Sequence, residues 1–96
     1  MRFEWDQEKS ARNEGLHGVS FQEAQALFTS DAPVLEVYDI DHSETEDRFK
    51  SIGPIKRGLV LVVWTERADY VVRIISARWA TKSEQQLYAD YVENLP

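Results

Sequence analysis

The apolar positions in the second half of the chain predict three consecutive strands. Residues 48–55 are expected to form the first, and a turn at Lys56-Arg57-Gly58 leads into LVLVVWT, residues 59–65. This run is continuously apolar, which is typical of a strand covered on both faces. Residues 66–69 are expected to form a four-residue hairpin connection to the strand YVVRIISA, residues 70–77. These segments together predict a strand meander.

A first helix is predicted before the meander. Asp6 is a suitable N-cap for a helix that runs from Gln7 toward Glu14. Gly15 is expected to end this helix, because glycine adopts the left-handed conformation found at helix ends. The segment GLHGV then becomes a connector in which Gly15 and Gly18 permit a tight reversal, with His17 at its apex.

Two capping boxes mark the starts of further helices. Ser20 and Glu23 form the first box, which opens the helix FQEAQALF. Thr81 and Glu84 form the second, which opens a last helix. Each helix has one apolar side, made of Phe21, Ala24, Leu27 and Phe28 in the former and of Leu87, Tyr88, Tyr91, Val92 and Leu95 in the latter.

Two shorter segments complete the predicted order of elements. FEWD, residues 3–6, is a short strand-like opening, and VLEVYD, residues 34–39, is typical of an edge strand after a proline. The order is a short strand, two helices, a strand meander and a closing helix. It predicts an α+β, two-layer sandwich with the helices packed on a mainly antiparallel sheet. A chain of 96 residues has room for one core only, so residues 1–96 are expected to form a single domain.

The composition indicates an ordered protein of a reducing compartment. Hydrophobic residues make up 43% of the chain, and there are three tryptophans but no cysteine. Disulfides and thiolate metal sites are therefore excluded. The N-terminus lacks the apolar segment of a signal peptide, and no apolar run is long enough to span a bilayer. We expect a cytoplasmic protein with no membrane partner.

The charges are divided unevenly along the chain. Its net charge is −6, which at first argues against a nucleic-acid partner. Residues 1–47 contain three basic and twelve acidic groups, whereas residues 48–82 contain eight basic groups and only Glu66 and Asp69 as acids. Such a division permits a basic face on an acidic protein, although scattered surface charge is the alternative.

The acidic segment DIDHSETED, residues 39–47, invites comparison with a metal-binding loop. The calcium-loop pattern fails here, because it requires glycine where Glu44 stands and a glutamate where Lys50 stands. We therefore expect a solvated acidic loop and no metal. His42 is expected to cap or orient this loop.

Three arginines and two tryptophans could bind RNA. Alternation places Arg73 on the face of its strand that carries Val71, Ile75 and Ala77, where it either meets a phosphate or pairs with an acid of a neighbouring strand. Arg78 at the strand end and Arg67 in the hairpin could also meet a phosphate, or Arg67 could simply be exposed. Trp64 and Trp79 could stack on bases, although a core position is the alternative for Trp64.

Several phrases of the sequence together resemble the BrnT family, whose members are ribonuclease toxins of type II toxin–antitoxin systems. The matching blocks cover nearly the whole chain in order: F-x-W-D at Phe3–Asp6, N-x-x-x-H-G-V-S-F-x-E-A at Asn13–Ala24, D-x-D-H-S-x-x-E-D-R at Asp39–Arg48, T-E-R at Thr65–Arg67, and R-I-I-S-A-R-x-A-T at Arg73–Thr81.

This resemblance implies a RelE-like fold and a metal-independent endoribonuclease that inhibits translation. It also implies a BrnA-type antitoxin as partner. Such an antitoxin would neutralise the toxin, form a heterotetramer with it, and connect it to promoter DNA only indirectly, as an autorepressor.

The resemblance also suggests roles for single residues. RNA cleavage without metal needs a base at the 2′-hydroxyl, cations at the phosphate, and a proton donor at the leaving oxygen. His17 or Glu66 could supply the base or the acid. Arg67 and Arg78 are the candidates for stabilising the phosphorane, and substrate binding is assigned to Arg73, Trp79 and Lys50.

One departure from the family opens an alternative. Members typically have K-H-G where this chain has Leu16-His17-Gly18. Loss of one charged donor at a transition state can cost on the order of 10²–10³ in rate. The chain could therefore be a weakened or inactive RelE-like binding module that acts through antitoxin binding and promoter autorepression. A structural domain with an unrelated partner is a third possibility.

Overall fold

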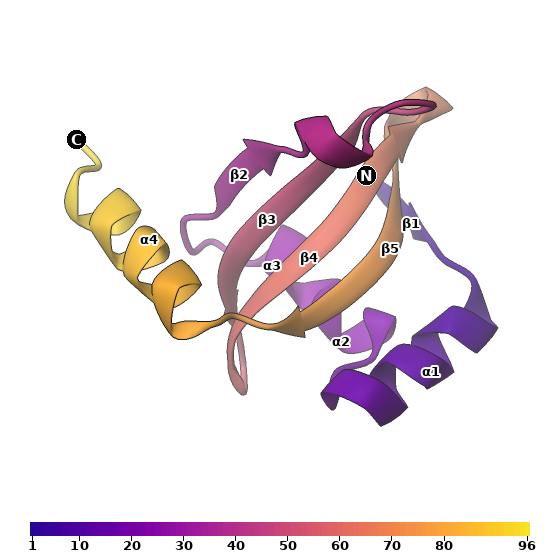
Figure 1. Cartoon of the computed structure of the whole chain (residues 1–96), viewed down its shortest axis with the longest axis horizontal. Coiled ribbons are helices and arrows are strands. Elements are labelled where there is room, and N and C mark those ends of the chain that lie inside the picture. Colours follow the sequence, from indigo (N-terminus) through magenta and orange to yellow (C-terminus); the bar gives the residue numbers. More distant parts are fainter.

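A five-stranded sheet forms the centre of the protein in the computed structural model, which describes residues 1–96 (Figure 1). The spatial order is β1-β5-β4-β3-β2. β1 pairs with β5 in parallel, and all other neighbours are antiparallel, which confirms a mainly antiparallel sheet. The strands are β1 (Arg2–Glu4), β2 (Leu35–Tyr38), β3 (Arg48–Ile55), β4 (Gly58–Arg67) and β5 (Val71–Trp79).

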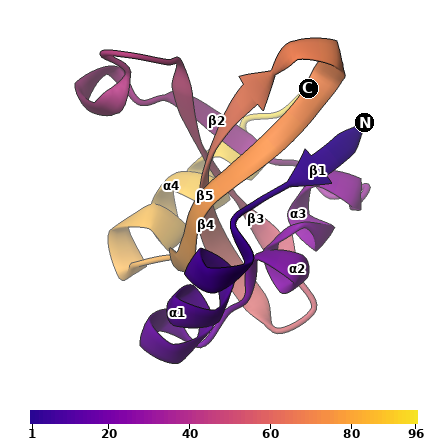
Figure 2. The same ribbon diagram turned by 90° about the vertical axis from the view of Figure 1, so that its right-hand side faces the viewer.

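The helices lie on both faces of this sheet (Figure 2). They are α1 (Gln7–His17), α2 (Phe21–Ala24), α3 (Ala26–Thr29) and α4 (Lys82–Glu93), with the short 3₁₀ turns η1 (Ile40–His42) and η2 (Ala68–Tyr70). Helices α2 and α3 cover one face, hereafter the helical face, and α1 lies along the edge of β5. Helix α4 lies against one end of the other face, hereafter the open face. The expected two layers therefore describe the sheet and α2–α3, and α4 adds a partial third layer.

Helix α1 is longer than the sequence pattern predicted, and the expectation for Gly15 was wrong. The helix continues through Gly15 and Leu16 to His17, because Gly15 keeps ordinary helical geometry. Gly18 takes the left-handed conformation instead, with φ of 77°, and its N–H donates to the carbonyl of Glu14. His17 consequently lies in the last helical turn and not at the apex of a loop.

The segment 21–28 forms two short helices rather than one, with a break at Gln25. Its apolar side was predicted correctly, because Phe21, Ala24 and Leu27 are buried against the sheet. The first capping box is only half formed. The Ser20 hydroxyl accepts from the Glu23 N–H, but the Glu23 carboxylate turns away to a neighbouring arginine instead of returning to the backbone.

The connection between β4 and β5 also differs from the prediction. β4 continues through Glu66 and Arg67, and the chain reverses in η2, where Asp69 and Tyr70 have φ of 63° and 62°. A bulge then interrupts the pairing, since Trp64 lies opposite Ile74 while Val63 lies opposite Ser76. The bulge shifts the alternation of β5 beyond Ile74.

That shift corrects the predicted face of one strand residue. Arg73 and Val71 lie on the open face, but Ala77 lies on the helical face, where it is buried with Val72 and Ile74. A bulge adds one residue to a strand, so every side chain after it changes face relative to strict alternation.

The apolar core lies mainly on the helical face. It joins the buried residues of α2 and α3 to those of the central strands, and Trp64 is part of it, with its Nε1–H donating to Ser51 Oγ. A smaller cluster of Ile52, Leu61 and Ala80 receives Tyr88 of α4 on the open face. The second capping box is complete, as predicted, but Leu87, Val92 and Leu95 remain exposed. None of the helices has the length and apolar character needed to cross a membrane.

Candidate active site on the open sheet face

Four cations project from the open face of the sheet. Alternation along β3 places Arg48 and Lys50 there, and the pairing register places Arg67 of β4 and Arg73 of β5 on the same face. Helix α4 covers only the far end of this face, around Ile52 and Leu61. Four of the eight basic residues of segment 48–82 thus lie together on one surface.

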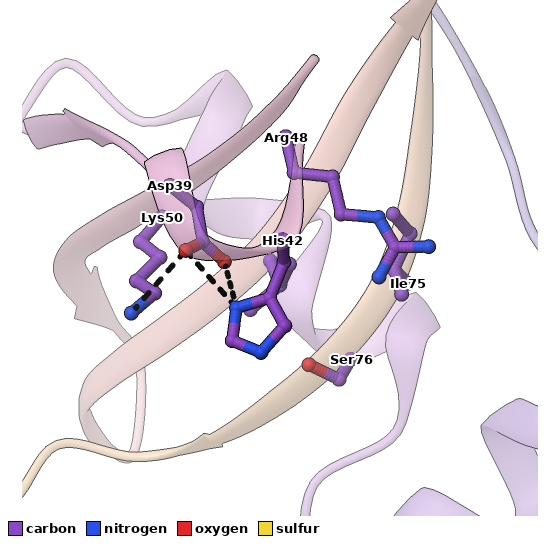
Figure 3. A pocket seen from close by; sticks show the side chains of 7 residues that line it. Asp39, His42, Arg48, Lys50, Ile75 and Ser76 are labelled. Atoms are coloured by element: carbon purple, nitrogen blue, oxygen red, sulfur yellow. Dashed lines mark hydrogen bonds and ion pairs between the residues drawn. The ribbon is translucent and has the colours of Figure 1, made fainter. Parts of the chain in front are cut away.

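A pocket of about 230 Å³ opens beside this basic surface. Its walls come from η1, β3, β4 and β5, so the pocket joins segments that are far apart in the sequence (Figure 3). A second, more open hollow adjoins it and shares His42 and Arg48. The residues that line the first pocket are Asp39, His42, Arg48, Lys50, Val63, Ile75 and Ser76.

Asp39 and His42 form the centre of the pocket. The His42 Nδ1 lies 3.1 and 3.0 Å from the two carboxylate oxygens of Asp39, and the Lys50 Nζ lies 3.9 Å from one of them (Figure 3). The Ser43 hydroxyl donates to the carbonyl of Asp39 and accepts from the N–H of Arg48, which fixes the loop against β3. The expectation that His42 orients this loop is confirmed.

The electrostatics of the pair favour an ionised Asp39. This side chain is buried, which alone would raise its pKa, but the hydrogen bond from His42 and the charge of Lys50 outweigh burial, so the pKa lies below its ordinary value. A carboxylate at Nδ1 holds the imidazole in one orientation and leaves Nε2 free. The His42 side chain is 65% exposed, so a ligand can reach Nε2.

Two glutamates hold Arg48, Arg67 and Arg73 in an alternating chain of ion pairs across the part of the open face that α4 leaves uncovered. Arg48 Nη2 lies 3.4 Å from Glu46, and the same carboxylate lies 3.7 Å from Arg67 Nη2. Arg67 Nε lies 3.9 Å from Glu4, which lies 3.7 Å from Arg73 Nη1. The alternative for Arg73, pairing with an acid of a neighbouring strand, is therefore what the structure shows. The Nε of Arg48 is buried without a hydrogen-bond partner.

The structure does not bring His17 and Glu66 together. Gly18, next to His17, lies beside the indole of Trp79 at one end of β5, whereas Glu66 pairs with Val72 at the other end. Val72 and Trp79 are seven positions apart along β5, which is about 20 Å for a strand that contains a bulge. The side chain of Glu66 also points to the helical face of the sheet, whereas that of Arg67, the next residue of β4, points to the open face. These two residues cannot act as acid and base on one phosphate.

Arg78 is engaged in a structural contact. Its Nη1 and Nη2 donate to the two carboxylate oxygens of Glu84 at 2.7 and 2.8 Å, and Glu84 also accepts from the N–H of Thr81. The bidentate Arg78 contact lowers the pKa of Glu84 to about 2. Arg78 thus connects β5 to the first turn of α4.

Trp79 lies on the helical face, away from the pocket. The Arg57 guanidinium lies 5.0 Å from the centre of its ring, and Gly18 and Gly58 both approach the indole. Arg57 in turn donates to Glu23 and to the carbonyl of Gly18 at 2.6 Å. Arg57, Gly18 and Gly58 therefore occupy space around the Trp79 ring that a stacking base would need.

The sequence interpretation gave no catalytic or binding role to Asp39, His42, Arg48 or Ser76. The signal was present, because the first three belong to the block D-x-D-H-S-x-x-E-D-R and Arg48 alternates with Lys50 along β3. The sequence does not show that the chain folds back at this block, so that η1 lies over the sheet and shares a pocket with Ser76 of β5.

The sequence model of the family described as "Ribonuclease toxin, BrnT, of type II toxin-antitoxin system" matches residues 5–84. The chain belongs to the BrnT family. The match includes every residue that lines the pocket and ends in the first turn of α4. A toxin of a type II system has an antitoxin as its partner, so this membership implies one for the present BrnT-family protein.

A solved structure supports the fold of this family member. The crystal structure of the Brucella abortus ribonuclease toxin BrnT superposes with a TM-score of 0.63 at 24% sequence identity. The similarity covers 85% of the present chain and 99% of the Brucella chain. No curated protein sequence matches the chain.

Proposed function

We propose that the protein is a metal-independent endoribonuclease toxin and that the pocket around His42 is its active site. The observation that carries this proposal is the Asp39–His42 pair, which lies beside Arg48 and Lys50 in a pocket of the open face. A histidine with an oriented ring, next to several cations, meets the needs of phosphodiester cleavage by a 2′-hydroxyl. Family membership supports the same activity.

In this mechanism His42 is the general base. Its Nε2 takes the proton of the 2′-hydroxyl, and the 2′-oxygen attacks the adjacent phosphorus. Asp39 holds the ring and stabilises the imidazolium that forms, as a buried carboxylate does for a catalytic histidine. The base role thus moves to His42 from His17 and Glu66, which lie at opposite ends of β5.

The cations of the open face act on the phosphate. Arg48, with Arg73 and Arg67 beyond it, stabilises the charge that develops on the non-bridging oxygens. The bond from phosphorus to the 5′-oxygen then breaks, and the Lys50 ammonium supplies the proton that this leaving oxygen needs. The products are a 2′,3′-cyclic phosphate and a 5′-hydroxyl end. Arg78 and Trp79 take structural roles in this account.

The family also suggests the biological setting that we propose. The protein acts in the cytoplasm as a single RelE-like domain, inhibits translation by cutting RNA, and is neutralised by a BrnA-type antitoxin. The two proteins assemble as a heterotetramer, and the antitoxin provides the contact with promoter DNA. Membership of a type II toxin family and the mixed α+β fold support this setting.

The test is cleavage of a labelled single-stranded RNA by the purified protein in the presence of EDTA. We expect cleavage with 2′,3′-cyclic phosphate and 5′-hydroxyl ends, and no cleavage at a position whose 2′-hydroxyl is replaced by hydrogen. Cleavage that requires a divalent cation, or that leaves 5′-phosphate ends, would refute the mechanism. Absence of cleavage together with tight antitoxin binding would favour the binding module that the departure at Leu16 suggests.

A further inference from the structure

Five arginines of the protein form ion pairs, and they fall into two groups that differ in how tightly their partners hold them. Arg57 and Arg78 donate to Glu23 and Glu84 in bidentate contacts of 2.6 to 2.8 Å. Arg48, Arg67 and Arg73 are instead held at 3.4 to 3.9 Å by carboxylates that each serve two guanidinium groups. Contacts of the first group connect elements of the fold, whereas those of the second group are loose.

The loose contacts form a continuous line across the sheet. The register places Arg48, Thr65, Arg73 and Glu4 next to one another on β3, β4, β5 and β1. Neighbouring strands lie about 4.8 Å apart, so the Cα atoms of Arg48 and Arg73 are about 10 Å apart. Arg48 also lines the pocket of His42, so the line begins at the proposed catalytic site.

We propose that Arg48, Arg67 and Arg73 form a track for the phosphate backbone of single-stranded RNA, and that Glu4 and Glu46 close this track in the free protein. Phosphate oxygens take the places of the two carboxylates when RNA binds. The inference rests on the proposed ribonuclease function and adds two residues to it, since it makes these glutamates competitors of the substrate. The RNA crosses the strands and presents one phosphate to His42.

The contacts that must be exchanged are weak enough for this role. The side chains of Arg67 and Glu4 are 50% and 44% exposed, and ion pairs of this kind contribute little to stability because water competes with them. Arg48 also retains an unused donor, the buried Nε, in the free protein. A phosphate that carries several acceptor oxygens can satisfy donors that the two shared carboxylates leave only partly engaged.

Glu4 and Glu46, two of the acidic residues that give the chain its negative net charge, thereby have a role in the selection of ligands. Two carboxylates among three guanidiniums leave the track with a small positive charge, which reduces binding of arbitrary polyanions. Opening the track then depends on a ligand that supplies several phosphates in sequence, as a single strand of RNA does.

The experiment measures binding of a fluorescent, uncleavable 2′-O-methyl RNA by anisotropy over a range of sodium chloride concentrations. The variants are Glu4→Gln, Glu46→Gln and the double variant. Glu93→Gln is the matched control, because it removes the same charge at the exposed end of α4, outside the track. We expect each single variant to bind about threefold more tightly than the control, and the double variant about tenfold.

A second measurement, cleavage of the corresponding unmodified RNA, separates this inference from the proposed function. Tighter binding by the track variants without cleavage by any protein would support the track and refute the ribonuclease. Cleavage by the native protein with equal or weaker binding by the track variants than by the control would refute the track and retain the enzyme. Absence of both binding and cleavage by every protein at low salt would overturn both.

Discussion

The side chain of Asn13 gives the sharpest test of how the first helix is attached to the sheet. β1 pairs with β5 only from Val71 to Arg73, so the edge of β5 is open beyond that point. There the Asn13 amide donates to the Ala77 carbonyl at 2.6 Å and accepts from the Ala77 N–H at 3.3 Å. It also donates to the Val19 carbonyl at 2.8 Å. The amide thus substitutes for a neighbouring strand.

Replacement Asn13→Ala should therefore destabilise the protein strongly. It removes three buried hydrogen bonds, each with a net contribution of about 1 kcal/mol, so the expected loss is about 3 kcal/mol. The total stability of a domain of this length is roughly 5–14 kcal/mol. A melting temperature lower by roughly 12–24 °C would follow.

Urea unfolding followed by tryptophan fluorescence measures this loss. Asn94→Ala is the matched control, because the Asn94 amide donates to the Asp90 carbonyl in an exposed helix end, and its loss should cost under about 0.5 kcal/mol. Asn13→Asp keeps the acceptor but loses both donors, and it should not restore stability. An Asn13→Ala protein as stable as the control would refute the reasoning.

Three further perturbations test the fold and the location of the site. Gly15→Ala should stabilise the protein by about 0.5–1 kcal/mol, because Gly15 is helical with open space around it. Gly18→Ala should destabilise it by about 1 kcal/mol, because the φ of Gly18 is 77°. Thermal melts in which both substitutions shift the melting temperature in the same direction would contradict the observed helix end. Arg78 lowers the pKa of Glu84 to about 2, so the ionised Glu84 stabilises the folded protein by about 3 kcal/mol. This contribution is complete above pH 4.5 and is lost as the pH falls toward 2. Urea unfolding should show the stabilities of the native protein and Glu84→Gln converging over that range, and a constant difference would argue against the pair. Leu16→Lys should leave stability and RNA cleavage nearly unchanged, because Leu16 is 79% exposed on α1. A gain of a hundredfold in cleavage would move the site to the end of α1.

The strands were the most predictable part of the fold. Residues 48–55 form β3 with the expected bounds, and the continuous apolar run of 59–65 lies inside β4 with both faces covered over much of its length. These patterns report burial directly, because each side chain of a strand faces either a core or water. Helix starts were equally readable, since Asp6 and Thr81 cap their helices as predicted.

Two features could not be read from the sequence because they depend on pairing. The bulge at Ile75 arises only when β5 aligns with β4, and it moves Ala77 to the helical face. The choice between Gly15 and Gly18 as the helix end is similar. Both glycines tolerate the left-handed conformation. The chain reverses at Gly18, because the helix continues until the Asn13 amide bonds to β5 and the N–H of Gly18 donates to the carbonyl of Glu14.

The candidate site was predicted in part. Arg67, Arg73 and Lys50 do share one face, as the basic segment suggested. The sequence interpretation chose His17 for the chemistry and gave His42 only a role in its loop, although each histidine belongs to a family block. Their surroundings separate them, because His17 ends a surface helix, whereas His42 is held by a buried carboxylate in a pocket.

The two histidines also provide the most direct test of the central claim, that RNA is cleaved at the open face. The measurement is kcat/KM for cleavage of a short RNA, in EDTA, by His42→Ala and His17→Ala, with melting curves to establish that both fold. General-base catalysis typically contributes 10²–10⁴-fold, so His42→Ala should lose activity by about that factor while His17→Ala stays within about threefold of the native protein. Loss of activity in His17→Ala with an unchanged His42→Ala would contradict the account and place the chemistry at the end of α1.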